Sequence, residues 1–415
     1  MTQPSPQSAS PSASAPIAPP TPRCAHFGHC GGCQYQDLPY PAQLTLKQAT
    51  LRDHLLAAGL VEIPEIVPHS SDPWHYRNRI RLRLARIAGT LRFGYNRANA
   101  AGPEAFLPIA ECPIAAPLLL RAAQALAALD TTLTGPARLW LDAATEVELF
   151  TNATETRLQL TLFARNAPKA GFPDLCQALQ LRVPELTGAG AAILPAQLSG
   201  RSRRAEHPKP GPTWGADGLL YTLTSAASTE PETHWITRGA FFQTNRFLLE
   251  TLDHLATAAR TGALAWDLYA GVGLFTRALA AQFDQVVAVE AAEPAATGLA
   301  RSLKGTLHRA VASTTLDFLQ SAVLQRDRPD LILMDPPRAG VGPEVCALLA
   351  RLRAPKIVYV SCDPLTLARD LALLIPHGYH LTELHLVDMF PQTFHMEAVA
   401  ILHREALLPP RAPQN

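Results

Sequence analysis

No apolar run in this 415-residue sequence approaches the ~20 residues that a helix needs to span a bilayer. Residues 1–22 also lack the basic start and the apolar centre of a signal peptide. We therefore expect a cytoplasmic protein with no membrane partner. A large excess of charge is missing too, because the formal net charge is only +1. Overall charge thus gives no support for a nucleic-acid partner, and local patches would have to hold one.

Hydrophobic residues make up 47% of the chain and charged residues 17%, which indicates a soluble globular protein. The chain is too long for one ordinary core and predicts two or three domains. Residues 1–22 are rich in Ser, Pro and Ala and cannot bury enough apolar surface to order themselves, so we predict a disordered tail there. No internal repeat is visible.

The cysteines are unevenly distributed along the chain. Four of them fall in its first third: Cys24, Cys30, Cys33 and Cys112. Clustered cysteines in a cytosolic protein indicate metal binding before disulfides. The first three share a glycine-rich loop, in which Gly31 and Gly32 let the backbone curl around a bound ion or cluster. Cys112 can supply a fourth ligand from a distant loop.

Zinc and an iron–sulfur cluster are both open as occupants of such a site. Structural zinc sites usually pair two short knuckles, whereas here three ligands sit together and one lies far away. That arrangement favours a cubane iron–sulfur cluster. His26 and His29 could compete as ligands, although neither is needed if Cys112 ligates.

Residues 23–69 are expected to form an N-terminal unit, a cluster-binding loop followed by one helix. The helix is predicted over residues 40–59, with Gly59 as its stop. Its apolar residues recur near helical spacing. They are Leu44, Leu51, Leu55 and Leu56.

A β-rich, RNA-contacting domain is predicted over residues 70–237. Near its start, in residues 76–84, arginines alternate with mostly apolar residues, so a strand would place one set on each face. The basic face would comprise Arg77, Arg79, Arg81 and Arg83. Guanidinium forks match phosphate geometry, and acidic residues are missing from this face. Both points favour RNA binding over the alternative of a solvated sheet face.

Further strand-like runs in the middle domain are residues 138–150, 157–163 and 219–224. Residues 200–215 combine arginines with several prolines. This composition predicts an exposed basic loop.

From residue 238 onward, strands and helices alternate, which predicts a parallel α/β sheet over residues 238–415. A strand at 264–268 leads into a turn where Gly271 and Gly273 let a ligand approach the backbone. The next strand ends in Glu290, an acid that can accept hydrogen bonds from ribose hydroxyls. An adenosine-containing cofactor is implied, with NAD and S-adenosylmethionine both open.

Three later residues lie where predicted strands begin or end. Asp335 and two prolines close an apolar run, a turn that resembles those of S-adenosylmethionine-dependent methyltransferases acting at carbon. Cys362 follows another apolar run, and sheets of this kind bind ligands beyond the carboxyl ends of their strands. Glu397 precedes the last apolar strand. The alternatives are a buried, inert cysteine and two acids that cap turns.

Together these segments resemble the bacterial RNA uracil-5-methyltransferases over nearly everything after Pro22. The resemblance implies an α/β fold, in which a C-terminal Rossmann-like methyltransferase domain joins the β-rich domain and an N-terminal iron–sulfur loop. It implies Cys362 as the nucleophile and Glu397 as the base. The implied cofactor-binding residues are Gln243, Tyr269, Glu290 and Asp335, together with the turn residues Gly271 and Gly273.

The cysteine pattern resembles the iron–sulfur members that modify 23S ribosomal RNA, whereas the transfer-RNA branch typically lacks this cluster. We therefore expect a monomer that binds S-adenosylmethionine and a [4Fe–4S] cluster. It should make 5-methyluridine in 23S rRNA through a covalent cysteine adduct at carbon 6. The alternatives are a tRNA uridine C5-methyltransferase, an iron–sulfur electron carrier and a non-catalytic iron–sulfur RNA-binding module.

Two positions depart from the family pattern. Ala270 stands where many members have cysteine, and Asp363 stands where many have asparagine. Neither change removes a reacting group. A carboxylate at position 363 would nevertheless disfavour the thiolate of Cys362 if it pointed inward.

Overall fold

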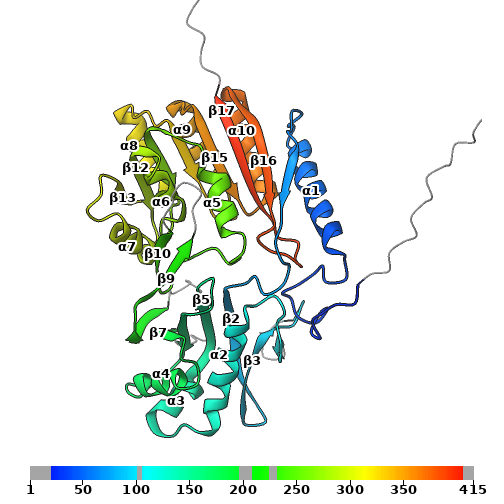
Figure 1. Ribbon diagram of the computed structural model, residues 1–415, viewed down its shortest axis with the longest axis vertical. Coiled ribbons are helices and arrows are strands. Elements are labelled where there is room, and N and C mark those ends of the chain that lie inside the picture. The colour runs from blue at the N-terminus through cyan, green and yellow to red at the C-terminus, as the bar shows by residue number, and fades with distance from the viewer. Residues whose placement is uncertain (1–19, 101–104, 196–207, 224–230, 405–415) are drawn as a thin grey trace, which may run out of the picture.

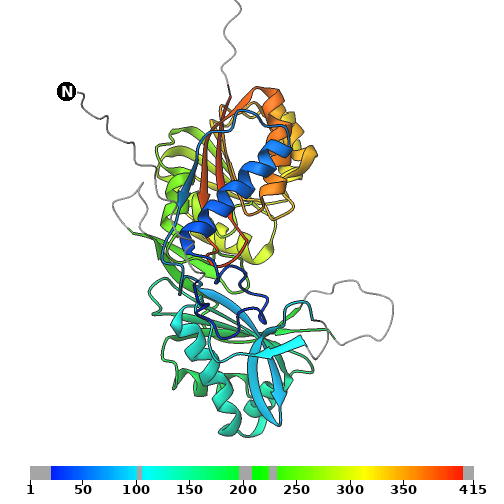
Figure 2. The ribbon, with the colours of Figure 1, turned by 90° about the vertical axis from the view of Figure 1, so that its right-hand side faces the viewer.

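The computed structural model describes residues 20–100, 105–195, 208–223 and 231–404. Nearly all of the predicted tail lies outside these ranges. The described chain forms two bodies, an upper one around the C-terminal sheet and a lower one around a second sheet (Figure 1). The segment that precedes the first helix runs at their junction (Figure 2). Within the described ranges, no helix is both long enough and apolar enough to cross a membrane.

The upper sheet has eight strands in the order β1-β16-β17-β15-β14-β11-β12-β13. Neighbours run parallel except at β17, which is antiparallel to β15 and to β16. The winding direction reverses between β11 and β14, the point at which such sheets bind ligands beyond their strand ends. The strands are β1 (Ile66–His69), β11 (Gly262–Leu268), β12 (Phe283–Glu290), β13 (Arg309–Ala312), β14 (Leu331–Met334), β15 (Lys356–Ser361), β16 (Tyr379–Val387) and β17 (Glu397–Arg404).

Helices pack on both faces of this sheet and bury it on both sides. One core joins the sheet to α1, α8, α9 and α10, and another joins it to α5, α6 and α7. A doubly covered strand such as β15 is therefore a continuous apolar run. The helices are α1 (Tyr40–Ala57), α5 (Leu249–Thr257), α6 (Leu274–Ala280), α7 (Glu293–Ser302), α8 (Thr315–Gln325), α9 (Gly342–Leu352), α10 (Pro364–Leu374) and the short 3-10 helix η3 (Ile375–His377).

The lower body is a seven-stranded sheet in the order β4-β3-β2-β5-β6-β7-β8, which shares one core with three helices. A separate two-stranded sheet, β9-β10, packs its apolar residues into the core of the upper body. The elements are β2 (Arg79–Ile87), β3 (Thr90–Asn96), β4 (Phe106–Pro108), α2 (Pro117–Ala128), η2 (Leu129–Thr131), α3 (Gly135–Ala143), β5 (Ala144–Thr151), β6 (Leu158–Ala164), α4 (Phe172–Gln180), β7 (Leu186–Ile193), β8 (Lys209–Gly215), β9 (Gly218–Leu223) and β10 (Glu232–Thr237).

Two segments of the lower body differ from the sequence prediction. Residues 138–143 belong to α3 rather than to a strand, because Ala137, Trp140 and Leu141 follow helical spacing and are buried together. Of the predicted basic loop at 200–215, residues 209–215 form the edge strand β8. Residues 196–207 lie outside the described ranges.

The N-terminal helix also differs from its prediction in what it buries. Its buried face comprises Gln43, Lys47, Leu51 and Leu55, whereas Leu56 is 51% exposed. The strand that follows, β1, pairs with β16 and extends the C-terminal sheet. α1 and β1, which the sequence placed in an N-terminal unit, therefore pack as part of the upper body.

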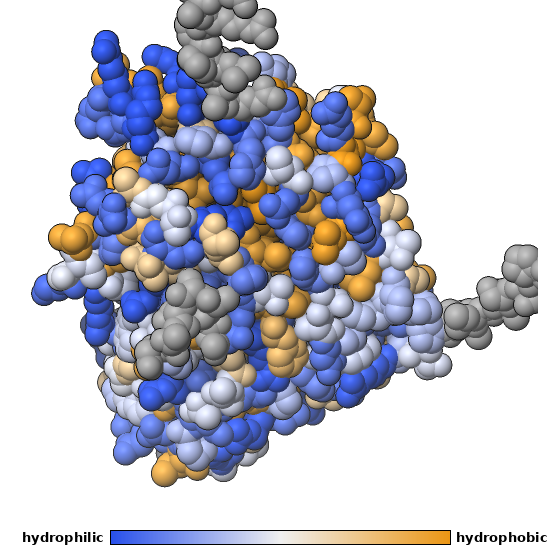
Figure 3. All heavy atoms as spheres, turned by 45° about the horizontal axis from the view of Figure 1, so that its top comes forward, coloured by the Kyte–Doolittle hydropathy of each residue, from blue (hydrophilic) through white to orange (hydrophobic). Residues whose placement is uncertain are grey.

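Some large apolar side chains are exposed on the described surface. Val61, Leu307 and Leu181 are 86%, 85% and 83% exposed, and they come from different parts of the chain. On the face shown in Figure 3, hydrophilic side chains interrupt the apolar ones. Single exposed hydrophobic residues are normal and do not mark a docking site.

Candidate active site and cysteine centre

The two predicted reacting groups lie at adjacent strand ends. Cys362 directly follows β15, and Glu397 is the first residue of β17, the neighbouring antiparallel strand. Ser361 pairs with Ala398, so the next residue of each strand brings the thiol and the carboxylate to the same place. Glu397 is 1% exposed and Cys362 is half-buried. The structure thus brings together two residues that are 35 positions apart in the sequence.

The charges around the thiol disfavour its ionisation. Burial, followed by the negative charges of Glu397 and Asp335, raises the pKa of Cys362 to about 12. The nearby cation Arg338 opposes it. Reaction as a thiolate therefore requires positive charge or a deprotonating group when the substrate is bound.

Glu397 has the properties of a proton acceptor. Burial and the charge of Asp335 raise the pKa of Glu397 well above its usual range, and Arg338 again opposes the shift. Oε1 of Glu397 is buried and has no hydrogen-bond partner among the described residues. A buried carboxylate with a free oxygen and a raised pKa is suited to general base catalysis.

Asp335, directly after β14, is held by a residue from outside the sheet. Nε2 of Gln243 donates to Oδ2 of Asp335 over 3.1 Å, and the backbone carbonyl of Gln243 accepts from Nδ2 of Asn78 at 3.2 Å. Burial raises the pKa of Asp335 to about 7, whereas the hydrogen bond from Gln243 lowers it. Two of the expected cofactor residues are therefore in direct contact.

The glycine turn brings the other expected cofactor residues together. Tyr269, Gly271 and Gly273 all have positive φ, of 61°, 58° and 90°, and Gly273 directly precedes α6. Glu290, at the end of β12, accepts from the backbone N–H groups of Gly271 at 2.9 Å and Ala292 at 2.6 Å. The curled backbone beside a strand-end acid fits an adenosine-containing cofactor such as S-adenosylmethionine.

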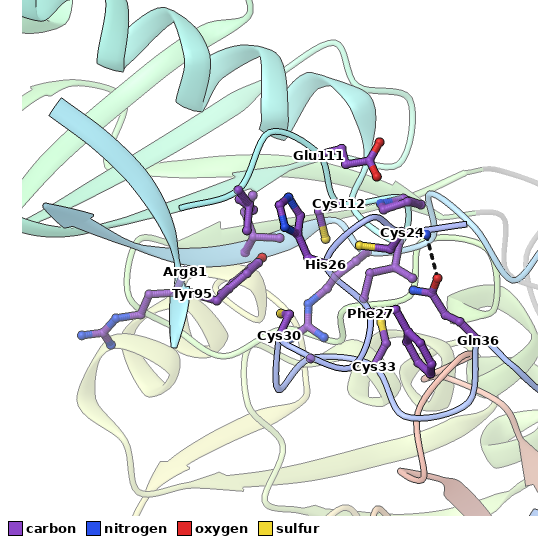
Figure 4. A pocket seen from close by; sticks show the side chains of 16 residues that line it. Cys24, His26, Phe27, Cys30, Cys33, Gln36, Arg81, Tyr95, Glu111 and Cys112 are labelled. Carbon is purple, nitrogen blue, oxygen red and sulfur yellow. Dashed lines mark hydrogen bonds between the residues drawn. The ribbon is translucent and has the colours of Figure 1, made fainter. Parts of the chain in front are cut away.

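All four predicted ligand cysteines line one cavity of about 230 Å³ (Figure 4). Three come from the loop of residues 24–33, which we call the cysteine loop, and Cys112 comes from the segment between β4 and α2. The loop is held there in part by a hydrogen bond from the N–H of Ala98 to the carbonyl of His29. Nε2 of His26 accepts a hydrogen bond from Ala110 at 3.3 Å, which leaves this nitrogen engaged.

The thiols of the cavity disfavour one another's ionisation. Burial, followed by the charges of the neighbouring thiols, raises the pKa of Cys33 to about 12 and that of Cys112 to about 11. Arg77 lines the same cavity, and its positive charge lowers the pKa of Cys112. Four thiolates can exist here only with bound positive charge, which suits a metal centre.

Zinc and an iron–sulfur cluster make different demands on the spacing of their ligands. In the described part of the chain, no three His, Cys, Asp or Glu side chains stand close enough to hold a single metal ion. A tetrahedral zinc site needs four ligands at about 2.3 Å from one ion. A multi-iron cluster instead binds each thiolate through a different iron and so accepts wider spacing.

Two of the four arginines on the predicted face pair with acids from the next strand. Arg81 forms an ion pair with Glu146, and Arg79 NH1 lies 3.6 Å from Glu148, both on β5. Arg77 lies outside β2, where its Nε donates to the carbonyl of Arg79 at 3.0 Å. The expectation that this face lacks acidic residues was wrong, because β5 supplies them.

Two side chains near the reacting groups were not predicted as site residues. Arg338, three positions after Asp335, shifts the pKa values of both Cys362 and Glu397. Nη2 of Arg338 lies 3.2 Å from Nδ1 of His395, and burial and that cation lower the pKa of His395 to about 4. The signal was present in the sequence, since Arg338 follows the two prolines and His395 lies two positions before Glu397.

The sheet has its switch point beside strand-end acids and a glycine turn, which suits an adenosine-containing cofactor such as S-adenosylmethionine. A cysteine lies beside a buried glutamate at the same edge, an arrangement found in enzymes that use covalent catalysis. The family model described as tRNA (Uracil-5-)-methyltransferase matches residues 234–405. The 23S rRNA (uracil(1939)-C(5))-methyltransferase RlmD of Pseudomonas fluorescens is 33% identical over 395 residues, which cover 91% of this chain and 79% of that protein. The chain belongs to the RNA uracil-5-methyltransferase family and is an S-adenosylmethionine-dependent RNA (uracil-C5)-methyltransferase.

Other similar proteins span most of the chain as well. An uncharacterized RNA methyltransferase of Thermotoga maritima is 30% identical over 399 residues, covering 92% of this chain and 84% of that protein. The crystal structure of Pyrococcus abyssi tRNA (uracil-54, C5)-methyltransferase with S-adenosyl-L-homocysteine has a TM-score of 0.67 and 22% identity. That likeness covers 90% of this chain and 86% of the other, and it shows a common fold.

Proposed function

We propose that this enzyme methylates carbon 5 of a uridine in 23S rRNA, with Cys362 as nucleophile and Glu397 as base. The observation that carries the chemistry is the placement of the thiol and the buried carboxylate at adjacent ends of β15 and β17. The choice of ribosomal RNA is supported by the similarity to RlmD over 91% of the chain and by the four cysteines around one cavity. Transfer RNA is the second candidate, because the matching family model is described by that substrate.

Carbon 5 of uracil is a poor nucleophile, so the ring must first be activated. The thiol of Cys362 gives its proton to a base from the solvent, and its sulfur forms a bond to carbon 6 while the ring electrons move toward the oxygen on carbon 4. Arg338 favours this step, because its charge opposes the effects that raise the pKa of Cys362. S-adenosylmethionine would be held by Gln243, Glu290 and Asp335. It would supply the methyl group that carbon 5 acquires and would leave as S-adenosylhomocysteine.

Glu397 then completes the reaction. Its carboxylate accepts the proton of carbon 5, the double bond between carbons 5 and 6 re-forms, and the bond from carbon 6 to the sulfur of Cys362 breaks. The free, buried Oε1 of Glu397 is the acceptor for this proton. The target uridine must leave its stack to reach Cys362, which costs least in a single-stranded loop.

We further propose that Cys24, Cys30, Cys33 and Cys112 hold a [4Fe–4S] cluster. The shared cavity, the repulsion among the thiols and the nearby positive charge of Arg77 support this assignment. A cluster bound there would tie the cysteine loop to the lower body through Cys112. Anaerobically purified protein should be brown and contain iron and sulfide, and colourless protein with stoichiometric zinc would contradict the assignment.

Two substitutions separate the roles of the reacting groups. Cys362→Ala should give neither methylation nor a covalent enzyme–RNA species. Glu397→Gln should still form the adduct and transfer the methyl group, so a methylated covalent complex should accumulate and survive denaturing electrophoresis. Full activity of Cys362→Ala, or loss of activity in Glu397→Gln without trapped RNA while cofactor binding is intact, would show that the roles are wrong.

The substrate is tested by mapping 5-methyluridine in cells that lack the protein. Loss of the modification from 23S rRNA, restored by the wild-type gene and not by Cys362→Ala, is the expected result. Loss from tRNA alone would make transfer RNA the substrate while leaving the chemistry unchanged.

A further inference from the structure

The loop that leads to the catalytic base packs against the chain that leaves the cysteine centre. This loop, residues 388–396, connects β16 to β17 and ends at Glu397; we call it the base loop. The backbone N–H groups of Gln34 and Tyr35 donate to the carbonyl of Gln392 at 2.9 and 3.1 Å. In the sequence, Gln34 lies next to the proposed ligand Cys33, and Gln392 lies only a few residues before Glu397.

One buried glutamine of α1 joins the two segments a second time. Nε2 of Gln43 lies 2.8 Å from the carbonyl of Tyr35 and 3.0 Å from Oε1 of Gln392. Oε1 of Gln43 accepts from the backbone N–H of Gln392 at 3.0 Å. Gln43 is completely buried and Gln392 is 3% exposed. Because these groups are out of water, loss of either partner leaves the other without a replacement.

The conformation of Gln392 depends on these contacts. Its φ is +69°, in the region that favours glycine, and a side chain is held there only when its surroundings fix the backbone. Here the surroundings are Gln43 and the turn after Cys33. From Gln392 the chain continues through a compact turn, in which Oγ1 of Thr393 donates to the carbonyl of Phe390 at 2.8 Å, before it reaches Glu397.

The nucleophile is held by different parts of the molecule. Ser361, just before Cys362, pairs with Ala398 inside the sheet, and Asp363, just after it, caps α10. The start of the base loop is likewise fixed without the cysteine loop, because Lys47 of α1 forms a buried ion pair with Asp388. Glu397 also pairs with Val387 in the sheet, but the chain enters it directly from the base loop. Loosening the contacts of Gln392 should therefore disturb the base more than the thiol.

We propose that the Gln43–Gln392 pair makes the cysteine loop a positioning element for Glu397, so that disorder in that loop slows the removal of the carbon 5 proton. This inference rests on the proposed function. Gln43 and Gln392 are positioning residues, and neither contacts the reacting atoms. Addition of Cys362 to carbon 6 and transfer of the methyl group should remain close to the wild-type rate, because they precede the step that needs Glu397.

The test uses Gln43→Ala and Gln392→Ala, with Gln48→Ala as the control. Gln48 lies on the same helix and bonds instead to the carbonyl of Ile66 at 2.9 Å. In single turnovers with RNA and labelled S-adenosylmethionine, both variants should resolve the methylated adduct about 10- to 100-fold more slowly, which is the usual cost of a displaced catalytic group. Methyl transfer should stay within about threefold of the wild type, and Gln48→Ala should match the wild type in both steps.

A second measurement does not depend on activity. Hydrogen–deuterium exchange of the backbone N–H groups of Gln34 and Tyr35 should be about tenfold faster in Gln43→Ala, since the bonds that protect them open more often. Cys33→Ser removes a proposed cluster ligand and should loosen the cysteine loop as well. Adduct resolution in this variant should slow as it does in Gln43→Ala. Combining Cys33→Ser with Gln43→Ala should slow it little further, because both changes act through one contact.

Several outcomes would overturn the inference. Wild-type adduct resolution in both glutamine variants would do so, as would equal slowing of methyl transfer and adduct resolution. If Gln43→Ala does not fold, Gln392→Ala decides, because it keeps the backbone bonds from Gln34 and Tyr35. If Glu397→Gln traps RNA and neither Gln43→Ala nor Gln392→Ala does, the proposed function stands and only this inference is rejected. If Glu397→Gln traps no RNA, the proposed function fails, and unchanged exchange at Gln34 and Tyr35 would reject the physical link as well.

Discussion

Oδ1 of Asp363, the residue directly after Cys362, accepts a hydrogen bond from the backbone N–H of Thr366 at 2.9 Å. The carboxylate therefore caps α10. The charges that raise the pKa of Cys362 come from Glu397 and Asp335. Aspartate at this position, which could have disfavoured the thiolate, is engaged in the cap instead. The structure tolerates Asp in place of Asn there because the two serve as N-caps about equally well.

Substitution of Asp363 should separate the cap from the charge. Asp363→Asn keeps the cap, so methyl transfer and the free energy of unfolding should stay close to the wild-type values. Asp363→Ala removes the cap and should cost about 1 kcal/mol of stability, measured by urea denaturation. A large acceleration of adduct formation in Asp363→Asn would instead mean that this carboxylate acts on the thiol.

A buried acid of the cofactor site should make stability depend on pH. Burial raises the pKa of Asp335 to about 7 in the folded state, against about 3.9 for an exposed aspartate. Its stabilising contribution is complete below about pH 4 and is lost as the pH rises through 7. The substitution Asp335→Asn would mimic the protonated acid, and the new amide can still accept a hydrogen bond from Gln243.

Asp335→Asn should therefore be more stable than the wild type at pH 8, by an amount on the order of 1–4 kcal/mol, and nearly equal to it at pH 4. Urea denaturation at the two pH values measures the difference, with Asp363→Asn as a control. Methylation should fall sharply in Asp335→Asn. A difference in stability that does not change with pH would contradict the assigned shift in the pKa of Asp335.

Much of the geometry of the candidate methyltransferase site could be predicted from the sequence because its signals are local. β15 is a continuous apolar run that ends beside Cys362, and its boundary was predicted to within one residue. The turn at Gly271 and the acid Glu290 follow their strands directly. In parallel sheets covered on both faces, such strand ends meet at one edge, so local patterns are enough to bring these residues together.

What could not be predicted depends on partners distant in the sequence. Gln43 and Lys47 are polar, and nothing near them indicates that they are buried against the base loop more than 340 positions away. The acids that face the arginines come from β5, about 65 residues after β2. α3 was missed because its helical spacing spans only a few buried residues before a strand begins.

The pairing of the arginines changes how their role in RNA binding should be tested. Arg83 donates to the neutral oxygen of Asn96 at 2.6 Å, so it can exchange that partner for a phosphate. Arg79 is only 14% exposed, lies near Glu148 and stacks 4.2 Å from the ring of Phe150. Of the two side chains, Arg83 is therefore the one available to RNA.

If this face binds RNA, Arg83→Gln should weaken binding of an RNA fragment and reduce the salt slope of log K by about one, because one phosphate contact is lost. Arg79→Gln should lower the free energy of unfolding and leave the salt slope unchanged. Affinity measured across a series of KCl concentrations gives both slopes. Equal salt slopes for the wild type and Arg83→Gln would indicate that this face is a solvated sheet surface and does not bind RNA.

The charges around Cys362 predict opposite effects on its reactivity. Removing the cation in Arg338→Gln should raise the pKa of the thiol, and removing the anion in Glu397→Gln should lower it, because each group acts on Cys362 with that sign. Only the thiolate reacts with iodoacetamide. At one alkaline pH, labelling of Cys362 should therefore be slower than wild type in Arg338→Gln and faster in Glu397→Gln.

Mass spectrometry of the Cys362 peptide after timed labelling measures these rates. The buried thiols Cys176 and Cys346 serve as internal controls, because neither is shifted by Arg338 or Glu397. A change of one pKa unit alters the thiolate fraction about tenfold, so even a partial shift is measurable. If both variants changed labelling in the same direction, altered access to the thiol would explain the result better than charge, and Arg338 would lose its assigned part in activating Cys362.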